Sequence, residues 1–229
     1  MGEKLIVLKN LTKSYEDRGK VITAVHGLDV EIEKGEFISI VGPSGCGKTT
    51  LLSLVSGLIK PTNGTVFVDG VDIWALTERD LALLRNKRIG FIFQFASLIP
   101  TLSAIENVML PAAFGDNEKK DSLSRARELM DLVGLSDRVD SYPSQLSGGE
   151  QRRVAIARAL MNKPAIILAD EPTGDLDEVT EGEVMKLFVK INKELGTTFL
   201  LVTHNTELTK QTDRKLTMKH GGFVSDDKC

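Results

Sequence analysis

The residues of this 229-residue chain best suited to chemistry lie in a glycine-rich loop that ends in a lysine and a threonine. Segment 42–49 fits the pattern G-x-x-x-x-G-K-[ST] at every fixed position. Glycines let the backbone curl close to an anion, Lys48 can reach the β- and γ-phosphates, and the Thr49 hydroxyl can ligate Mg²⁺. We therefore predict that a nucleoside triphosphate binds to a loop made of Gly42, Pro43, Ser44, Gly45, Cys46, Gly47, Lys48, Thr49 and Thr50.

The segments on either side of this loop can position it. Phe37–Val41 is a short apolar run that is typical of a buried strand, and apolar residues recur at helical spacing after the loop. A loop between a strand and a helix aims free backbone N–H groups and the positive end of the helix dipole at the phosphates. This context disfavours the alternative, a glycine-rich turn with an unrelated lysine.

A second candidate site contains two adjacent acids. Ala165–Ala169 is continuously apolar, as expected of a central parallel strand, and it ends in Asp170 and Glu171. Acids at the carboxyl end of such a strand lie where open α/β sheets bind ligands. We expect Asp170 to bind Mg²⁺, directly or through water, and Glu171 to polarise an attacking water molecule.

Composition limits the class of protein. The chain has 29 basic and 32 acidic residues, for a net charge of −3, which argues against a nucleic-acid partner. It contains no apolar run of about 18 residues that could span a membrane. Two cysteines form neither a disulfide framework nor a zinc site, so a reducing cytoplasm is the simplest setting.

The order of patterns along the chain predicts an α/β fold. Short β-like runs dominate up to residue 93, helical periodicity dominates from about 94 to 158, and buried strands return at 165–169 and 198–202. We expect 116–124 to form an exposed connection because it is charged and polar. The Arg152–Arg153 pair is predicted to face solvent or to pair with acids.

Further motifs link the chain to one family. Ser147–Glu150 follows Leu146 as an S-G-G-E sequence, Gly174–Asp177 follows the acidic pair, and His204 follows the last buried strand. With Gln94 and Tyr15, these segments have the order and spacing of motifs in ATP-binding cassette (ABC) ATPases, which the chain resembles over nearly its whole length. The resemblance implies one domain, 1–229, with a P-loop NTPase (RecA-like) core at 1–93 and 159–229. That core would carry an antiparallel β-subdomain and an inserted α-helical signature subdomain at 94–158.

The resemblance also implies roles for these residues. Two copies would form a head-to-tail homodimer around two ATP molecules, in which Ser147, Gly148 and Gly149 of one copy contact the γ-phosphate bound by the other. The remaining implied roles are adenine stacking by Tyr15, nucleotide contact by Asp177, γ-phosphate sensing by Gln94 and His204, water activation by Glu171, and Mg²⁺ binding by Thr49, Gln94 and Asp170.

Within the family, the chain is similar to the ATPases of lipoprotein-release, macrolide-export and cell-division permeases. This branch implies an integral-membrane permease as partner, bound through Phe95–Thr101, and a cytoplasmic location on the inner face of the cell membrane. The same apolar segment could instead seal the junction between core and lobe. Alternative functions are a nucleotide-regulated mechanotransmission scaffold and a soluble ATPase of nucleic-acid repair. Asn205 stands where this branch often has Asp.

Overall fold

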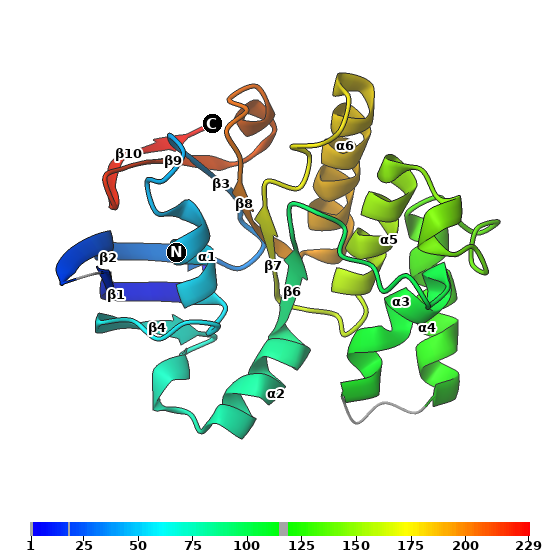
Figure 1. Cartoon of the computed structure of the whole chain (residues 1–229), viewed down its shortest axis with the longest axis horizontal. Coiled ribbons are helices and arrows are strands. Elements are labelled where there is room, and N and C mark those ends of the chain that lie inside the picture. The colour runs from blue at the N-terminus through cyan, green and yellow to red at the C-terminus, as the bar shows by residue number, and fades with distance from the viewer. Residues whose placement is uncertain (1, 18, 115–118) are drawn as a thin grey trace.

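The computed structural model describes residues 2–17, 19–114 and 119–229, which form two sheets flanked by helices (Figure 1). The first sheet has the order β2-β1-β4-β5 and is antiparallel throughout. Its strands are β1 (Lys4–Asp17), β2 (Lys20–Glu33), β4 (Asn63–Val68) and β5 (Val71–Asp72). In the second half of β2, buried and exposed residues alternate, which is the pattern of a strand with one face on a core.

The second sheet has the order β10-β9-β3-β8-β7-β6, and its central strands are parallel. Its strands are β3 (Phe37–Val41), β6 (Ile89–Ile92), β7 (Ile166–Asp170), β8 (Thr198–Val202), β9 (Arg214–Lys219) and β10 (Gly222–Lys228). Every residue of β3 and β8 is buried because both faces of the sheet are covered.

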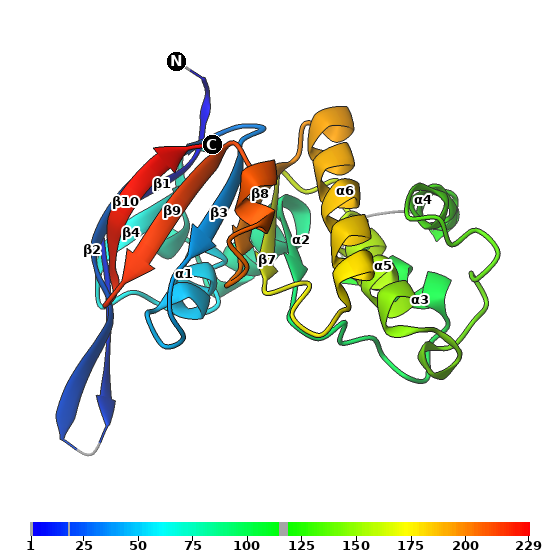
Figure 2. The same ribbon diagram turned by 90° about the horizontal axis from the view of Figure 1, so that it is seen from above.

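The helices lie on both sides of this parallel sheet. They are α1 (Lys48–Val55), α2 (Glu78–Arg88), α3 (Ala104–Met109), α4 (Lys119–Leu132), α5 (Gly148–Ala159) and α6 (Glu178–Leu195), with 3₁₀ turns η1 (Ile73–Ala75), η2 (Leu110–Phe114), η3 (Pro143–Gln145) and η4 (Leu208–Gln211). Figures 1 and 2 both show α3, α4 and α5 gathered on one side, with α6 between them and the sheet. No helix in the described part of the chain is long and apolar enough to cross a membrane.

Two hydrophobic cores share the parallel sheet between them. In β7, Ile167 and Ala169 pack with α3, α4, α5 and α6, whereas Ile166 and Leu168 pack with α1 and the antiparallel sheet. This division follows from the pleat, since successive side chains of a strand point to opposite faces. One continuous apolar run therefore holds the two halves of the molecule together.

The predicted α/β fold class is confirmed: a parallel core, an antiparallel β-part and a helical part are all present. The strands expected near 37–41, 89–93, 165–169 and 198–202 are found. The expectation that 116–124 is a connection is wrong for its second half, because α4 already begins at Lys119; residues 116–118 lie outside the described part. The subdomain boundaries at 94 and 158 stay a prediction.

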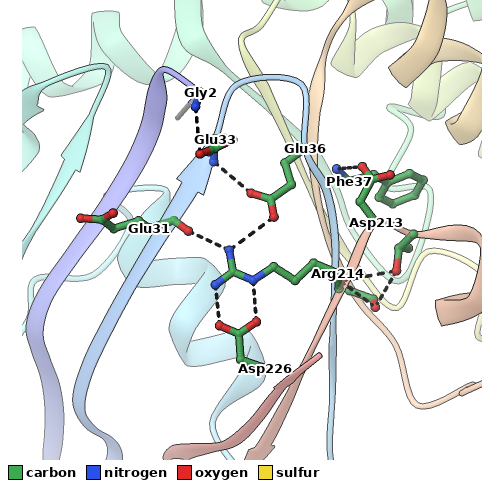
Figure 3. A network of polar contacts seen from close by, with 10 residues as sticks. Gly2, Glu31, Glu33, Glu36, Phe37, Asp213, Arg214 and Asp226 are labelled. Atoms are coloured by element: carbon green, nitrogen blue, oxygen red, sulfur yellow. Dashed lines mark hydrogen bonds and ion pairs between the residues drawn. The ribbon is translucent and has the colours of Figure 1, made fainter. Parts of the chain in front are cut away.

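A polar network joins the two sheets where β2 turns into β3 (Figure 3). The Arg214 guanidinium donates two 2.6 Å hydrogen bonds to the Asp226 carboxylate, and further bonds to the Glu31 carbonyl at 2.9 Å and the Glu36 carboxylate at 3.3 Å. The bonds from Arg214 hold the pKa of Asp226 below its usual value, and those to Asp226 raise the pKa of Arg214. This network fixes β9 and β10 against the antiparallel sheet.

We predict that Asp226→Asn destabilises the fold by about 1 kcal/mol near neutral pH, which is roughly 2–4 °C in melting temperature for a chain of this size. Asp226 titrates at a lower pH in the folded than in the unfolded chain, so its contribution is present above the unfolded pKa of about 4 and is lost as pH falls through the folded pKa.

Melting temperatures of wild type and variant, measured between pH 3 and 7, should therefore converge at the acid end. Asp227→Asn is the matched control, since it removes the same charge from the neighbouring residue. An unchanged gap between wild type and Asp226→Asn across this range would contradict the role assigned to the ion pair.

Candidate active site

The glycine-rich loop joins the end of β3 to the start of α1, as predicted. At Gly47 the backbone has φ of 108°, and a Cβ there would stand 2.2 Å from the Ala24 carbonyl oxygen, so both conformation and space require glycine. Gly47 is also the N-cap residue of α1 and has no side chain to cap the helix. The amide groups of the first turn of α1 are therefore available to an anion.

Lys48 is 7% exposed, and its ammonium lies against the loop. Its Nζ donates to the carbonyl oxygens of Gly42 at 2.8 Å and Pro43 at 3.0 Å, and it is 3.9 Å from the Cys46 Sγ. The structure thus places the positive charge beside the backbone that is expected to surround the phosphates.

Asp170, the last residue of β7, lies next to the loop. Burial raises the pKa of Asp170, and the neighbouring Glu171 charge adds to this, while a hydrogen bond with Thr49 and the charge of Lys48 lower it. The Thr49 hydroxyl and the Asp170 carboxylate, which are far apart in the sequence, therefore lie close to each other. A hydroxyl beside one carboxylate fits Mg²⁺, which takes few protein ligands and completes its shell with phosphates and water.

Glu171 and His204 form a second pair at the same sheet edge. The His204 Nδ1 is 3.3 Å from the Glu171 Oε2, and the Glu171 backbone N–H donates to the Val202 carbonyl at 2.9 Å. Glu171 has φ of 44°, a left-handed conformation that is unusual for a residue with a side chain. Such backbone strain is concentrated at functional sites.

Gln94 reaches the same place from the end of β6. A Cβ built on Gly174 would lie 3.8 Å from both the Gln94 Nε2 and the Glu171 Oε2, so the amide and the carboxylate flank one small volume. Glu171, predicted from its place after a buried strand, and Gln94 and His204, implied by the family resemblance, are thus brought together by the carboxyl ends of β6, β7 and β8.

The S-G-G-E segment begins α5. The Ser147 hydroxyl accepts from the Glu150 N–H at 3.2 Å, and the Glu150 carboxylate accepts from the Ser147 N–H at 2.7 Å, which makes a capping box. The backbone bond from Ser147 is the main reason why the pKa of Glu150 is lowered. Gly148 remains exposed beyond this cap.

A hollow of about 450 Å³ lies between this segment and Gly174–Asp177, and it is lined by Ser147, Gly148, Gly149 and Asp177 among others. None of its described lining residues comes from the phosphate loop. Asp177 is also the N-cap of α6: it accepts from the Thr180 N–H at 3.1 Å and the Thr180 hydroxyl at 2.6 Å, and the hydroxyl bond lowers its pKa. The start of α5 and the phosphate loop at the start of α1 therefore do not share this hollow within one chain.

Comparison with known proteins identifies the family that carries this geometry. A family model described as ABC transporter matches residues 25–174. The chain belongs to the ABC transporter family. The lipoprotein-releasing system ATP-binding protein LolD of Bacteroides thetaiotaomicron is 46% identical over 222 residues, covering 97% of this chain and 100% of that protein. The macrolide export ATP-binding/permease protein MacB of Rhodopirellula baltica is 43% identical and matches 97% of this chain, which spans 33% of MacB.

Solved structures agree with this assignment. The dimeric structure of MJ0796, a bacterial ABC transporter cassette, has a TM-score of 0.90 at 42% identity and covers 98% of each chain. A dimeric post-hydrolysis state of MJ0796 bound to ADP and Pi has a TM-score of 0.89 at 41% identity, again over 98% of each chain. The present protein is thus an ABC ATPase, and the site described above is its candidate site of ATP hydrolysis.

Tyr15 lies apart from the catalytic groups of this ABC ATPase, on β1. Its ring is 42% exposed, and the Lys13 ammonium is 5.1 Å from the ring centroid. The hairpin of β1 and β2 extends beyond the body of the molecule (Figure 2). An exposed ring beside a cation is compatible with stacking on a base, and adenine stacking by Tyr15 stays a prediction.

The structure corrects the interpretation of Arg152. Arg153 does lie 3.6 Å from the Glu183 carboxylate, but Arg152 is 3% exposed and donates to the backbone carbonyls of Phe93 and Gln94. Burial lowers the pKa of Arg152, and the charge of Asp175 opposes this. A polar stretch of sequence could not reveal this role, because its carbonyl partners lie far away in the chain.

Arg158, two turns further along α5, makes similar contacts. It donates to the Ala96 and Ser97 carbonyls at 2.8 Å each. Arg152 and Arg158 together bind four carbonyls of the segment that follows β6, and so attach the helix that begins at Ser147 to the segment that contains Gln94. Sequence analysis did not predict this link.

We predict that Glu171→Gln slows ATP hydrolysis by a factor of about 10² or more while ATP binding is retained, because the amide cannot accept the proton of the attacking water. The ATP-bound protein should then accumulate as a dimer, measured by light scattering after gel filtration in ATP. Glu78→Gln, on the exposed start of α2, is the control for loss of one acid. A variant that turns over like wild type would exclude Glu171 as the base.

Proposed function

We propose that this ABC ATPase powers a membrane transporter: two copies close head to tail around two ATP molecules and drive a separate permease. The observation that carries this proposal is the separation, within one chain, of two anion-binding helix ends. The start of α1 and the start of α5 each offer backbone N–H groups, but the hollow at the start of α5 has no described lining residue from α1 or the phosphate loop. A second copy related by two-fold symmetry would bring each α5 to the phosphates bound at the other α1.

Mg²⁺ completes the proposed site. Thr49 and Asp170 would hold it, with Gln94 close by, and the cation would neutralise negative charge that develops on the transferred phosphoryl group. Burial that raises the pKa of Asp170 supports this, since a carboxylate placed in that environment gains from a nearby cation. Lys48 and the Ser147–Gly149 segment of the second copy would stabilise the same charge, and Glu171 would orient the water.

A groove on the surface supports a permease partner. A cavity of about 690 Å³ lies among α2, η2 and the end of β6. Leu83, Phe93 and Phe114 in its lining are 36%, 44% and 71% exposed, and Arg79 and Arg85 also line it. An apolar floor with basic residues fits an amphipathic helix that carries acidic groups.

The predicted docking segment Phe95–Thr101 forms only part of this surface. Ser97 lines the groove and Phe95 is 65% exposed, but Leu98 packs partly buried against the core. The buried Asn107 also fixes the backbone of Ile99. The Asn107 Oδ1 accepts from the Ile99 N–H at 2.7 Å, and the Asn107 Nδ2 donates to the Ile99 carbonyl at 3.1 Å. We therefore propose that the first residues of the segment face the permease and that Leu98 seals the junction with the lobe.

The relatives favour transport over the alternatives. These relatives include the ATP-binding protein of a lipoprotein-releasing system and a macrolide export ATP-binding/permease protein. A peripheral position on the inner face of the cell membrane follows from a permease partner. A mechanotransmission scaffold would use the same groove, and reconstitution separates the two, since only a transporter moves cargo across the bilayer.

The groove gives a direct test of the partner. We predict that Phe114→Asp leaves ATP binding and basal hydrolysis unchanged but weakens assembly with the permease about tenfold or more, since exposed aromatic anchors dominate such interfaces. Assembly and stimulated hydrolysis would be measured in nanodiscs that contain the candidate permease.

Val224→Asp is the matched control, because Val224 is 61% exposed on β10, outside the groove. Assembly of Phe114→Asp at wild-type affinity would exclude the groove as the docking site. A loss of basal hydrolysis without loss of assembly would indicate that Phe114 supports the fold instead.

A further inference from the structure

Glu181, in the first turn of α6, contacts the two loops that carry Glu171 and His204. Its Oε1 accepts a 2.6 Å hydrogen bond from the Thr173 hydroxyl, and its Oε2 accepts a 2.8 Å bond from the Asn205 Nδ2. Thr173 is two residues after Glu171, and Asn205 directly follows His204. No sequence motif pointed to Glu181.

Together, these hydrogen bonds connect the two loops that carry Glu171 and His204. Glu171 and His204 meet at 3.3 Å, and the residues beside them are both held by one carboxylate. Thr173 is 4% exposed, so its hydroxyl has no ready access to water as a substitute partner. The distance between the Glu171 and His204 side chains therefore depends on Glu181.

Hydrogen bonds fix the orientation of the Asn205 side chain. Its Oδ1 accepts from the Glu207 N–H at 2.9 Å, and its backbone N–H donates to the Thr203 hydroxyl at 3.0 Å. The amide nitrogen must then face Glu181. An aspartate at this position would place one carboxylate against another. Asn205 and Glu181 are thus a matched donor and acceptor.

The helix that carries Glu181 is anchored by its cap and by a buried face. Asp177 caps the start of α6, and Val184, Met185, Phe188 and Ile191 are buried along it. A carboxylate on such a helix can define where two loops meet, because its own position is fixed by the packing of the helix.

We propose that Glu181 is a positioning residue for ATP hydrolysis: by holding Thr173 and Asn205, it sets the contact between Glu171 and His204. This inference rests on the proposed roles of Glu171 and His204. It adds a residue outside the predicted site and explains why an asparagine stands at position 205.

The test is a cycle of Asn205→Asp, Glu181→Gln and the double variant. In Asn205→Asp two carboxylates face each other, so this variant should lower kcat at least about fivefold. In Glu181→Gln the new amide can accept from Asn205 only by turning its nitrogen to the Thr173 hydroxyl, which must then accept instead of donate, so its loss of kcat should be smaller. In the double variant the new amide on α6 can accept from Thr173 through its oxygen and donate through its nitrogen to the new carboxylate beside His204. Hydrogen bonding is then restored with reversed polarity, and kcat should return to within about twofold of wild type.

KM for ATP and the melting temperature are measured with kcat, because positioning of the catalytic pair should change kcat at nearly constant KM. Glu194→Gln, exposed on the same helix, is the control. Wild-type kcat in Asn205→Asp, or a double variant no faster than Asn205→Asp, would overturn the proposal, as would losses explained by lower stability. Glu171→Gln separates the two levels: if it hydrolyses normally, the proposed site fails, whereas an inactive Glu171→Gln with an additive cycle rejects only Glu181.

Discussion

The catalytic groups depend on the pairing of β3, β8, β7 and β6. These strands are parallel neighbours in the order β3-β8-β7-β6, so their carboxyl ends lie along one edge. The predicted phosphate loop follows β3, His204 follows β8, the Asp170–Glu171 pair spans the end of β7, and Gln94 follows β6. A shift of one residue in any pairing would move its group by about 3.3 Å and turn alternate side chains to the other core. Hydrophobic burial on both faces of the sheet therefore maintains the catalytic distances.

Sequence predicted those parts of the site that are encoded locally. The phosphate loop could be identified because its glycines, Lys48 and Thr49 are adjacent in the chain, and β7 could be identified from an unbroken apolar run. Arg152 and Glu181 could not, because their partners are backbone carbonyls or side chains from distant segments. A polar residue on a helix has the same local pattern whether it faces water or binds another loop. Only the packing of α5 and α6 distinguishes the two cases.

The charges at the carboxyl ends of the parallel strands are arranged so that a bound cation would offset the desolvation of Asp170 and its repulsion by Glu171. Asp170 is partly buried beside Glu171, and both effects raise its pKa, while Thr49 and Lys48 lower it. Glu171 is held with positive φ, a conformation that costs of order 1–3 kcal/mol and is maintained by the surrounding contacts. Its N–H bond to Val202 and its contact with His204 are two of these contacts. Strain and desolvation thus gather at the groups predicted to act on ATP.

Arg152 and Arg158 connect the groove to α5, and this connection is a route by which a partner bound in the groove could affect the site. Their guanidiniums bind four carbonyls between Phe93 and Ser97, and Arg158 and Ser97 also line the groove. Bonds to charged groups contribute about 1.5–3 kcal/mol each, so separating this segment from α5 would cost more than the roughly 1–3 kcal/mol typical of coupling between sites. The segment and α5 should therefore move together. Because α5 begins at Ser147, a displacement in the groove must reach the helix end that is expected to close on the second copy's ATP.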